Sequence, residues 1–284
     1  RPSPRCTGER PERPARCRTV PDDLSPSQQE ETLPHELVHA LQDQSFDLEP
    51  MLKYKPGKSD RTSAIQHLVE GDATLAGLMI TYGSDFDPDP DAMRTAFLLS
   101  TQMSEVGAET PPIIVEGLVS PYTDGVEFVR AMRAQGGFSG IDAAFEKLPE
   151  TTEQTLHPDK YLKGEKALAV PAITTEKLEK LAVGFDDVNG ELGLLLMLGQ
   201  WTPTKVAVKA ADGWGGDRLV VARGTDDPKL FAVALYTKMD TVGDAKEFAL
   251  VLRKKFGTQC LERKDLGPLA WTIRGSDVVM VFDE

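Results

Sequence analysis

The chain has 284 residues, of which 40% are hydrophobic, enough for one large domain or two modest ones with a buried core. Its formal net charge of −13 argues against non-specific nucleic-acid binding, so we expect no nucleic-acid partner. The sequence contains no run of about 18 apolar residues, so we predict no transmembrane segment in this chain.

The first 24 residues differ in composition from the remainder. Six arginines and five prolines precede Asp22, and such a stretch buries little apolar surface. We therefore predict a basic, proline- and arginine-rich tail over residues 1–24. Because the chain begins at Arg1 rather than at Met, we expect a mature or partial chain, either exported or held at the cell envelope.

A helix is predicted to begin beside Ser25 and to run to about residue 44. Ser25 is a typical N-cap residue, Pro26 suits the first helical position, and Gln28 completes a capping box. Pro34 conflicts with this prediction, because a proline inside a helix removes one hydrogen bond and costs about 3 kcal/mol. The helix therefore either kinks at Pro34 or begins near Thr32, with the proline in its first turn.

His35, Glu36 and His39 form the His-Glu-x-x-His pattern of zinc peptidases. Residues four apart lie on one face of a helix, so two imidazoles at this spacing can bind one Zn²⁺ at about 2.0–2.1 Å. Glu36 lies about 100° around the helix, where it can act as general base toward a zinc-activated water. Leu37 and Leu41 are predicted to form an apolar stripe facing away from the histidines.

A second helix is predicted over residues 60–82 from apolar residues at helical spacing. It carries Glu70, which we predict to be the third zinc ligand. The alternatives for that role are His67, Asp72 and His157. Gly71 costs about 1 kcal/mol in mid-helix relative to Ala, which favours close packing against another backbone there.

The next part of the chain indicates further helices separated by turns. Four aspartates between residues 85 and 91 resemble a calcium loop, but Pro90 replaces the required Gly, so we predict a solvated turn. Helices are predicted over residues 92–105, 123–135 and 139–149, with a short helical turn over residues 152–156.

Residues 165–284 have a different texture and are predicted to form an α+β domain. The predicted strands cover residues 205–208, 218–221, 230–236, 269–273 and 278–282, and a helix is predicted over residues 241–256. This half contains no histidine and no evident ligand cluster. We therefore predict a packing or substrate-handling domain without catalytic residues.

Two stretches together resemble the gluzincins, the thermolysin-type clan of zinc peptidases. They are His35-Glu36-Leu37-Val38-His39-Ala40-Leu41-Gln42-Asp43-Gln44 and Val69-Glu70-Gly71-Asp72-Ala73. Over residues 24–284 the chain resembles, more narrowly, a group of poorly characterised bacterial proteins of this clan, through further stretches at residues 121–125, 152–161 and 213–218. The resemblance implies His35, His39 and Glu70 as zinc ligands, Glu36 as general base, and a zincin fold.

The resemblance also implies a His or Tyr across the cleft that stabilises the oxyanion. We predict His157 for this catalytic role, with Tyr122 as the next candidate. Two features depart from the clan. Thr74 stands where an Asp often orients a ligand His, so Asp72 or Asp43 would take that part. The strand that precedes the motif helix in zincins could come only from residues 17–20.

We therefore expect an α+β protein, with a mainly helical zincin-like metallopeptidase domain over residues 25–164 and a smaller α+β domain over residues 165–284. The expected activity is hydrolysis of a peptide or protein substrate by zinc-activated water. One alternative is a non-catalytic binding protein in which zinc stabilises two helices, and another is a metal-free interaction domain. A thiolate of Cys6 or Cys17 covering the zinc is a further hypothesis.

Overall fold

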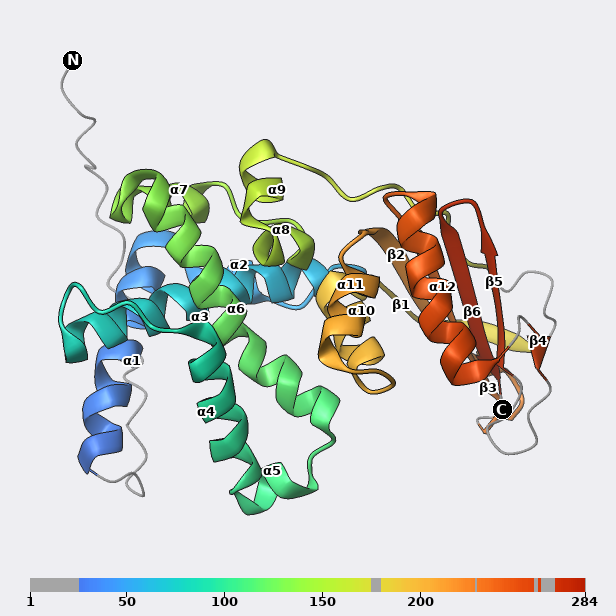
Figure 1. The fold of residues 1–284 in the computed structure, drawn as a ribbon, viewed down its shortest axis with the longest axis horizontal. Coiled ribbons are helices and arrows are strands. Elements are labelled where there is room, and N and C mark those ends of the chain that lie inside the picture. Colours follow the sequence, from blue (N-terminus) through green and yellow to red (C-terminus); the bar gives the residue numbers. More distant parts are fainter. Residues whose placement is uncertain (1–25, 175–179, 228, 258–259, 262–268, 284) are drawn as a thin grey trace.

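The computed structural model describes residues 26–174, 180–227, 229–257, 260–261 and 269–283. Within this part of the chain every strand comes from residues 181–283, and the residues before them form helices (Figure 1). The protein thus combines helices with an antiparallel sheet, as the α+β prediction states. The division after residue 164 and the zinc-peptidase character of the first half stay predictions.

The helices of the first half, as the structure bounds them, are α1 (Pro26–Phe46), α2 (Leu48–Leu52), α3 (Ser59–Tyr82), α4 (Pro90–Gln102), α5 (Glu105–Glu109), α6 (Pro112–Gly136), α7 (Phe138–Glu146), α8 (Thr152–Leu156) and α9 (Pro158–Lys163). Among the helices described, none combines the length and apolarity that a bilayer crossing needs.

Helix α1 runs without interruption through Pro34, so the predicted start near Thr32 is wrong. The packing of α1 against α3 offsets the lost hydrogen bond, because tertiary contacts rather than propensity hold most helices in place. Leu37 and Leu41 are 56% and 61% exposed, so the predicted stripe lies on the surface rather than in a core. Ser25, the predicted N-cap, lies outside the described residues.

Helices α3 and α6 cross at two glycines and form the centre of the helical half. A Cβ on Gly71 would lie 2.3 Å from the backbone of Gly125, and a Cβ on Gly125 would lie 2.3 Å from the carbonyl oxygen of His67. This confirms that Gly71 serves close backbone packing. The buried side chains around the crossing include Ile65, Leu68, Val69, Val126, Phe128, Val129, Ile141 and Phe145.

The helix predicted over residues 123–135 is found, but it begins 11 residues earlier than predicted, at Pro112. Helix α6 is a single element from Pro112 to Gly136 and contains Pro121. Val115, Val119 and Val126 are each no more than 5% exposed, so both sides of the proline bury apolar surface. That burial, at roughly 1.5 kcal/mol or more per valine, outweighs the cost of one proline.

The other predicted helices of this half are found with small changes. Asp89 caps α4 through its side chain, so the aspartate-rich stretch is a capping turn, as expected. Helix α7, predicted over residues 139–149, begins at Phe138 after Gly137 and ends at Glu146. The short helix α8 is confirmed, whereas α9, which begins at Pro158 directly after His157, was not predicted.

The second half contains a six-stranded sheet with the order β1-β2-β3-β6-β5-β4 and antiparallel neighbours. Its elements are β1 (Leu181–Asp187), α10 (Gly190–Gly199), α11 (Thr204–Ala211), β2 (Trp214–Gly224), β3 (Phe231–Met239), α12 (Val242–Phe256), β4 (Cys260–Leu261), β5 (Leu269–Arg274) and β6 (Asp277–Asp283). Figure 1 shows α12 lying along one face of the sheet. The hydrophobic core of this half includes Trp214, Met239, Phe248, Leu252 and Met280.

The structure of this half confirms four of the five strand predictions and the α12 prediction, and one strand prediction is wrong. Residues 205–208 belong to helix α11, because Ala207, Ala210 and Ala211 recur at helical spacing and are buried. Gly215 and Gly216 lie inside β2, which begins four residues before the predicted strand at 218. The closing hairpin of β5 and β6 is found as predicted, whereas β1 and α10 were missed.

Replacement of Gly125 by Ala tests the helix crossing. The new Cβ meets backbone that cannot rotate away, so we expect Gly125→Ala to lower the free energy of unfolding by about 3 kcal/mol. Gly136→Ala in the same helix is the matched control, since no atom lies within 4 Å of its Cβ position. Denaturant unfolding of both variants measures the difference, and equal stability would contradict the close crossing.

Candidate metal centre

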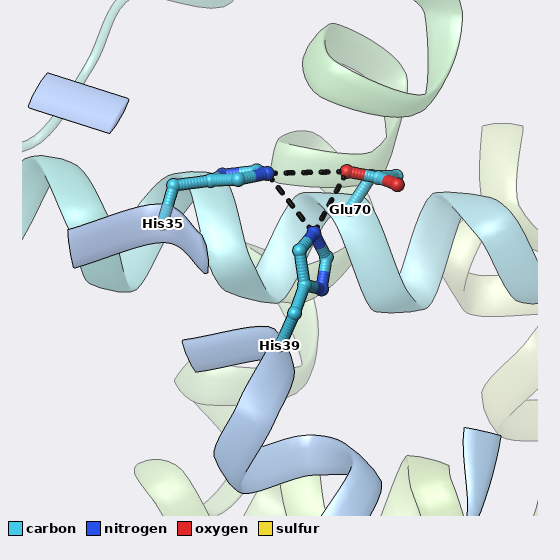
Figure 2. Close-up of side chains that lie close together, drawn as sticks. All are labelled: His35, His39 and Glu70. Atoms are coloured by element: carbon cyan, nitrogen blue, oxygen red, sulfur yellow. Dashed lines mark hydrogen bonds and ion pairs between the residues drawn. The ribbon is translucent and has the colours of Figure 1, made fainter. Parts of the chain in front are cut away.

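Helices α1 and α3 bring three ligand groups together, as Figure 2 shows. His35 Nε2 and His39 Nε2 lie 3.0 Å apart, and Glu70 Oε2 lies 3.3 Å from the first and 3.2 Å from the second. Ligand atoms of a tetrahedral zinc with bonds of 2.0–2.1 Å are about 3.3 Å apart. The three atoms therefore have the spacing of a zinc-binding set.

The hydrogen bonds of Gln42 determine which nitrogen of His39 carries a proton. Gln42 Nε2 donates to the carbonyl oxygen of Val69 at 3.0 Å and to Asp72 Oδ2 at 2.8 Å. Gln42 Oε1 therefore accepts from His39 Nδ1 at 2.8 Å. The lone pair of Nε2 then faces the Glu70 carboxylate, and two acceptors at 3.2 Å require a cation or a second proton between them.

The electrostatics of the three groups agree with their mutual contacts. Burial works to raise the pKa of Glu70, but hydrogen bonds from His35 and His39 lower it to about 2. Burial lowers the pKa of His39, while the contact with Glu70 and the charge of Glu36 raise it overall. The side chains of His35, His39 and Glu70 are 18%, 20% and 26% exposed, so the cluster is accessible to solvent.

Tyr122 of α6 lies beside the same cluster. Its ring centroid is 5.9 Å from that of His35 and 5.6 Å from that of Phe97. Burial, followed by the charge and hydrogen bond of the Glu70 carboxylate, raises the pKa of Tyr122 to about 12. The phenol therefore keeps its proton at neutral pH and donates it to Glu70.

Glu36 follows His35 on α1 and is half-buried. Its negative charge contributes to the raised pKa of His39 and, after burial and Glu70, to that of Tyr122. Glu36 therefore lies within electrostatic reach of both sides of the cluster.

The rivals of Glu70 for the third position have other partners. His67 is fully buried, with its ring nitrogens hydrogen-bonded to Thr155 and Ser120, and burial lowers its pKa to about 4. Asp72 receives the hydrogen bond from Gln42, and burial raises its pKa. The described cluster thus contains Glu70 and neither of these residues.

The residue that orients the ligand histidine is Gln42, which the sequence analysis did not consider. Asp72 is joined to His39 through Gln42 and also interacts with it by charge, whereas Asp43 accepts from the backbone N–H of Leu48 at 3.0 Å. The sequence signal that could have identified Gln42 is its spacing, because a residue three positions after His39 lies on the same face of the helix.

His157 lies in a different cluster. Its Nε2 is 2.8 Å from Glu191 Oε1 and 3.4 Å from Asp212 Oδ1, and the described contacts do not join it to His35, His39 or Glu70. The structure therefore brings together the three predicted ligands, Glu36 and Tyr122, but not His157. The residues predicted to supply a preceding strand, 17–20, and Cys6 and Cys17 lie outside the described part of the chain.

Comparison with known proteins gives one match. The family model described as "Domain of unknown function (DUF8575)" matches residues 179–281, the sheet-containing half. The chain matches no curated protein and no solved structure. The matched region contains Glu191 and Asp212 but none of the residues of the candidate metal centre.

The role of Gln42 is testable through zinc affinity. Gln42→Ala removes the hydrogen-bond acceptor of His39 Nδ1, so the orientation of the His39 ring is no longer fixed. We therefore expect the zinc dissociation constant to rise 10–100-fold, the usual effect of losing such a partner. Competition with a chromophoric chelator measures the constant. Gln44→Ala, at an exposed position of the same helix, is the control and should bind as the wild type does. An unchanged constant in folded Gln42→Ala would remove Gln42 from the site.

Proposed function

We propose that this protein is a zinc-dependent peptidase of the gluzincin type, with His35, His39 and Glu70 as zinc ligands. The observation that carries the proposal is the triangle of ligand atoms with sides of 3.0, 3.2 and 3.3 Å on two helices. The same triangle has a carboxylate, Glu36, and a phenol, Tyr122, within electrostatic reach. A metal ligand set, a base and a donor are the parts that amide hydrolysis requires.

The residues divide the chemistry among them. Bound zinc would supply Lewis acidity, polarising a peptide carbonyl and lowering the pKa of water. Glu36 would accept the proton of the attacking water and pass it to the leaving amine. The Tyr122 O–H, whose pKa is raised by burial, would donate to the carbonyl oxygen as negative charge develops there. We assign this last role to Tyr122 rather than to His157, because Tyr122 contacts the ligand cluster.

The arrangement of the helices supports a zincin-like fold for residues 25–164. Helix α1 carries the paired histidines, and α3 behind it carries the glutamate, as in the clan that the sequence resembles. In the described residues of this half all elements are helices, so no described edge strand lies beside the cluster for a peptide to align along. The proposed substrate is nonetheless a peptide or protein, because the sequence resembles a peptidase clan and the three ligand side chains are partly exposed.

The number of ligands supports a catalytic zinc site better than the alternative, a non-catalytic protein in which zinc stabilises two helices. A structural zinc site is usually closed by four protein ligands, whereas catalytic sites keep three and leave a position for water or substrate. The cluster within the described residues has three ligand groups, each about one-fifth to one-quarter exposed. In the metal-free alternative a second proton on His39, which its raised pKa favours, lies between His39 and Glu70, so metal analysis rather than this contact separates the two alternatives.

The general base is tested by Glu36→Gln. The amide occupies the same volume but accepts no proton, so hydrolysis of a denatured protein should fall at least 10²-fold while zinc content and fold are kept. Glu146→Gln, an exposed change on α7, serves as the control. Hydrolysis near the wild-type rate by zinc-loaded Glu36→Gln would exclude Glu36 as the base.

The phenol donor is tested by Tyr122→Phe, which keeps the ring contacts with His35 and Phe97 and removes only the hydroxyl. We expect kcat to fall 10²–10³-fold at saturating zinc, with a smaller change in KM, because the bond strengthens in the transition state. Tyr82→Phe, at a 53% exposed position of α3, is the matched control. A kcat within twofold of the wild type would leave Tyr122 with a packing role.

A further inference from the structure

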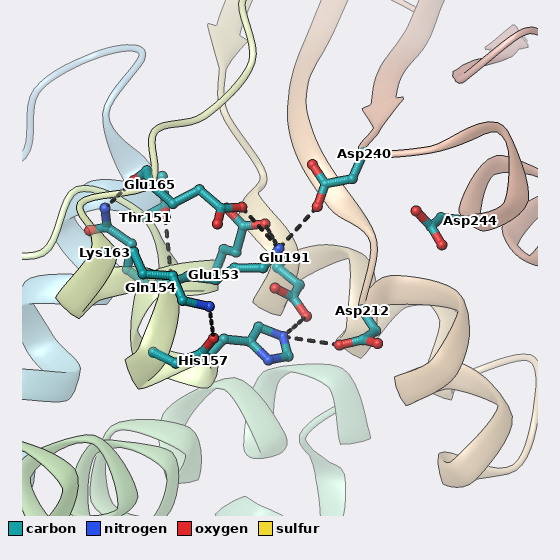
Figure 3. A network of polar contacts seen from close by, with 12 residues as sticks. Thr151, Glu153, Gln154, His157, Lys163, Glu165, Glu191, Asp212, Asp240 and Asp244 are labelled. Atoms are coloured by element: carbon teal, nitrogen blue, oxygen red, sulfur yellow. Dashed lines mark hydrogen bonds and ion pairs between the residues drawn. The ribbon is translucent and has the colours of Figure 1, made fainter.

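His157 belongs to a second cluster of ligand-type side chains, at the contact between the two halves of the protein (Figure 3). His157 precedes α9, Glu191 lies in the first turn of α10, and Asp212 follows α11. His157 Nε2 is 2.8 Å from Glu191 Oε1 and 3.4 Å from Asp212 Oδ1. One nitrogen and two carboxylates from both halves of the chain thus converge on one point, which corrects the expectation that the second half takes no part in a ligand cluster.

Glu191 is the informative member of this cluster. Its side chain is only 4% exposed, and its Oε2 is a buried oxygen without a hydrogen-bond partner among the described residues. Leaving a carboxylate oxygen buried and unpartnered is costly, and such atoms call for an explanation such as an ion. Figure 3 shows the Glu191 and Asp212 carboxylates turned toward the His157 ring.

The position of Glu191 is fixed by the backbone around it. Asp217 accepts the N–H groups of Asn189 and Gly190, both at 2.8 Å, and Thr152 Oγ1 accepts that of Leu192 at 3.0 Å. Gly190 has a φ of +78°, and a Cβ there would overlap the carboxylate of Asp60. These contacts hold the carboxylate in place before any ion arrives, as a built ligand site requires.

In a neighbouring acidic cluster the negative charges are balanced by a lysine side chain. Glu153, Glu165 and Asp240 surround the ammonium of Lys160 at 2.6, 3.3 and 3.0 Å. That cluster already holds its cation as a side chain. The described ion pairs of Glu191 and Asp212 are with His157 alone, and the charge of Lys160, which is engaged by its own three carboxylates, reaches Glu191 without an ion pair to it.

We propose that His157, Glu191 and Asp212 form a second site, which binds a divalent transition-metal cation and links the helical half to the sheet-containing half. Imidazole nitrogen and carboxylate oxygens are ligands of zinc, so Zn²⁺ is the appropriate probe. Asp212 is 63% exposed, which gives the ion a path to solvent. The inference does not rest on the proposed peptidase activity, because the site shares no ligand with His35, His39 and Glu70.

The test is zinc binding to His39→Ala, in which the first set of ligands is broken. Calorimetric titration with Zn²⁺ should show one equivalent bound by this variant. Adding Asp212→Asn should weaken that binding at least tenfold, and adding Glu191→Gln should do the same. Asp226→Asn, another exposed aspartate of the same half, is the matched control and should leave the affinity unchanged. Because Glu191 is buried and its replacement risks misfolding, exposed Asp212 decides the outcome.

The proposal is overturned if His39→Ala binds no zinc, since His157 and Glu191 are then only an ion pair that joins the halves. It is also overturned if zinc binds to His39→Ala with the same affinity after Asp212→Asn. Failure of the peptidase proposal has a different signature, namely zinc bound at His35, His39 and Glu70 without hydrolysis of any protein substrate.

Discussion

The close crossing of α3 and α6 at Gly71 and Gly125 is the constraint on which the candidate site depends. Without side chains at this point, the two backbones approach to a distance that no Cβ would tolerate. Glu70 is the neighbour of Gly71, and Tyr122 lies one turn before Gly125, so the crossing places the phenol against the carboxylate. Helix α1 then adds His35 and His39, and Gln42, through its own hydrogen bonds to α3, orients the His39 ring.

The same helix α3 connects the metal centre to the sheet-containing half. Buried His67, one turn before Gly71, is hydrogen-bonded to Ser120 of α6 and to Thr155 of α8. At the start of α3, Asp60 accepts from Thr152 of α8, whose hydroxyl also receives a bond from the backbone of α10. The buried side chains of Asp60 and His67 on α3 are therefore hydrogen-bonded across helices, and these bonds link α3 to α8 near the contact where Glu191 lies.

The local chemistry of the site could be predicted from the sequence, whereas its long-range partners could not. The i, i+4 spacing of the histidines and the mid-helix Gly71 each have a local physical meaning, so Glu70 and the helix crossing followed from them. The predictions around Pro121 and over residues 205–208 were wrong because they followed local propensity. In both segments the burial of one helix face outweighs the low helix propensity of proline and of β-branched residues. The pairing of His157 with Glu191, 34 residues later, has no sequence signal, since it depends on how α8 and α10 meet.

The central claim, that the His35, His39 and Glu70 set supports peptide hydrolysis, is tested most directly by sequencing the products of a denatured protein mixture. Zinc-loaded wild-type protein and folded His39→Ala would be incubated with the mixture in parallel, and new peptide termini identified by mass spectrometry. The account predicts new termini from the wild type, their loss on chelation, their return with zinc, and none from His39→Ala. Zinc-loaded, folded wild-type protein that releases no peptides, or equal cleavage by the variant, would contradict it.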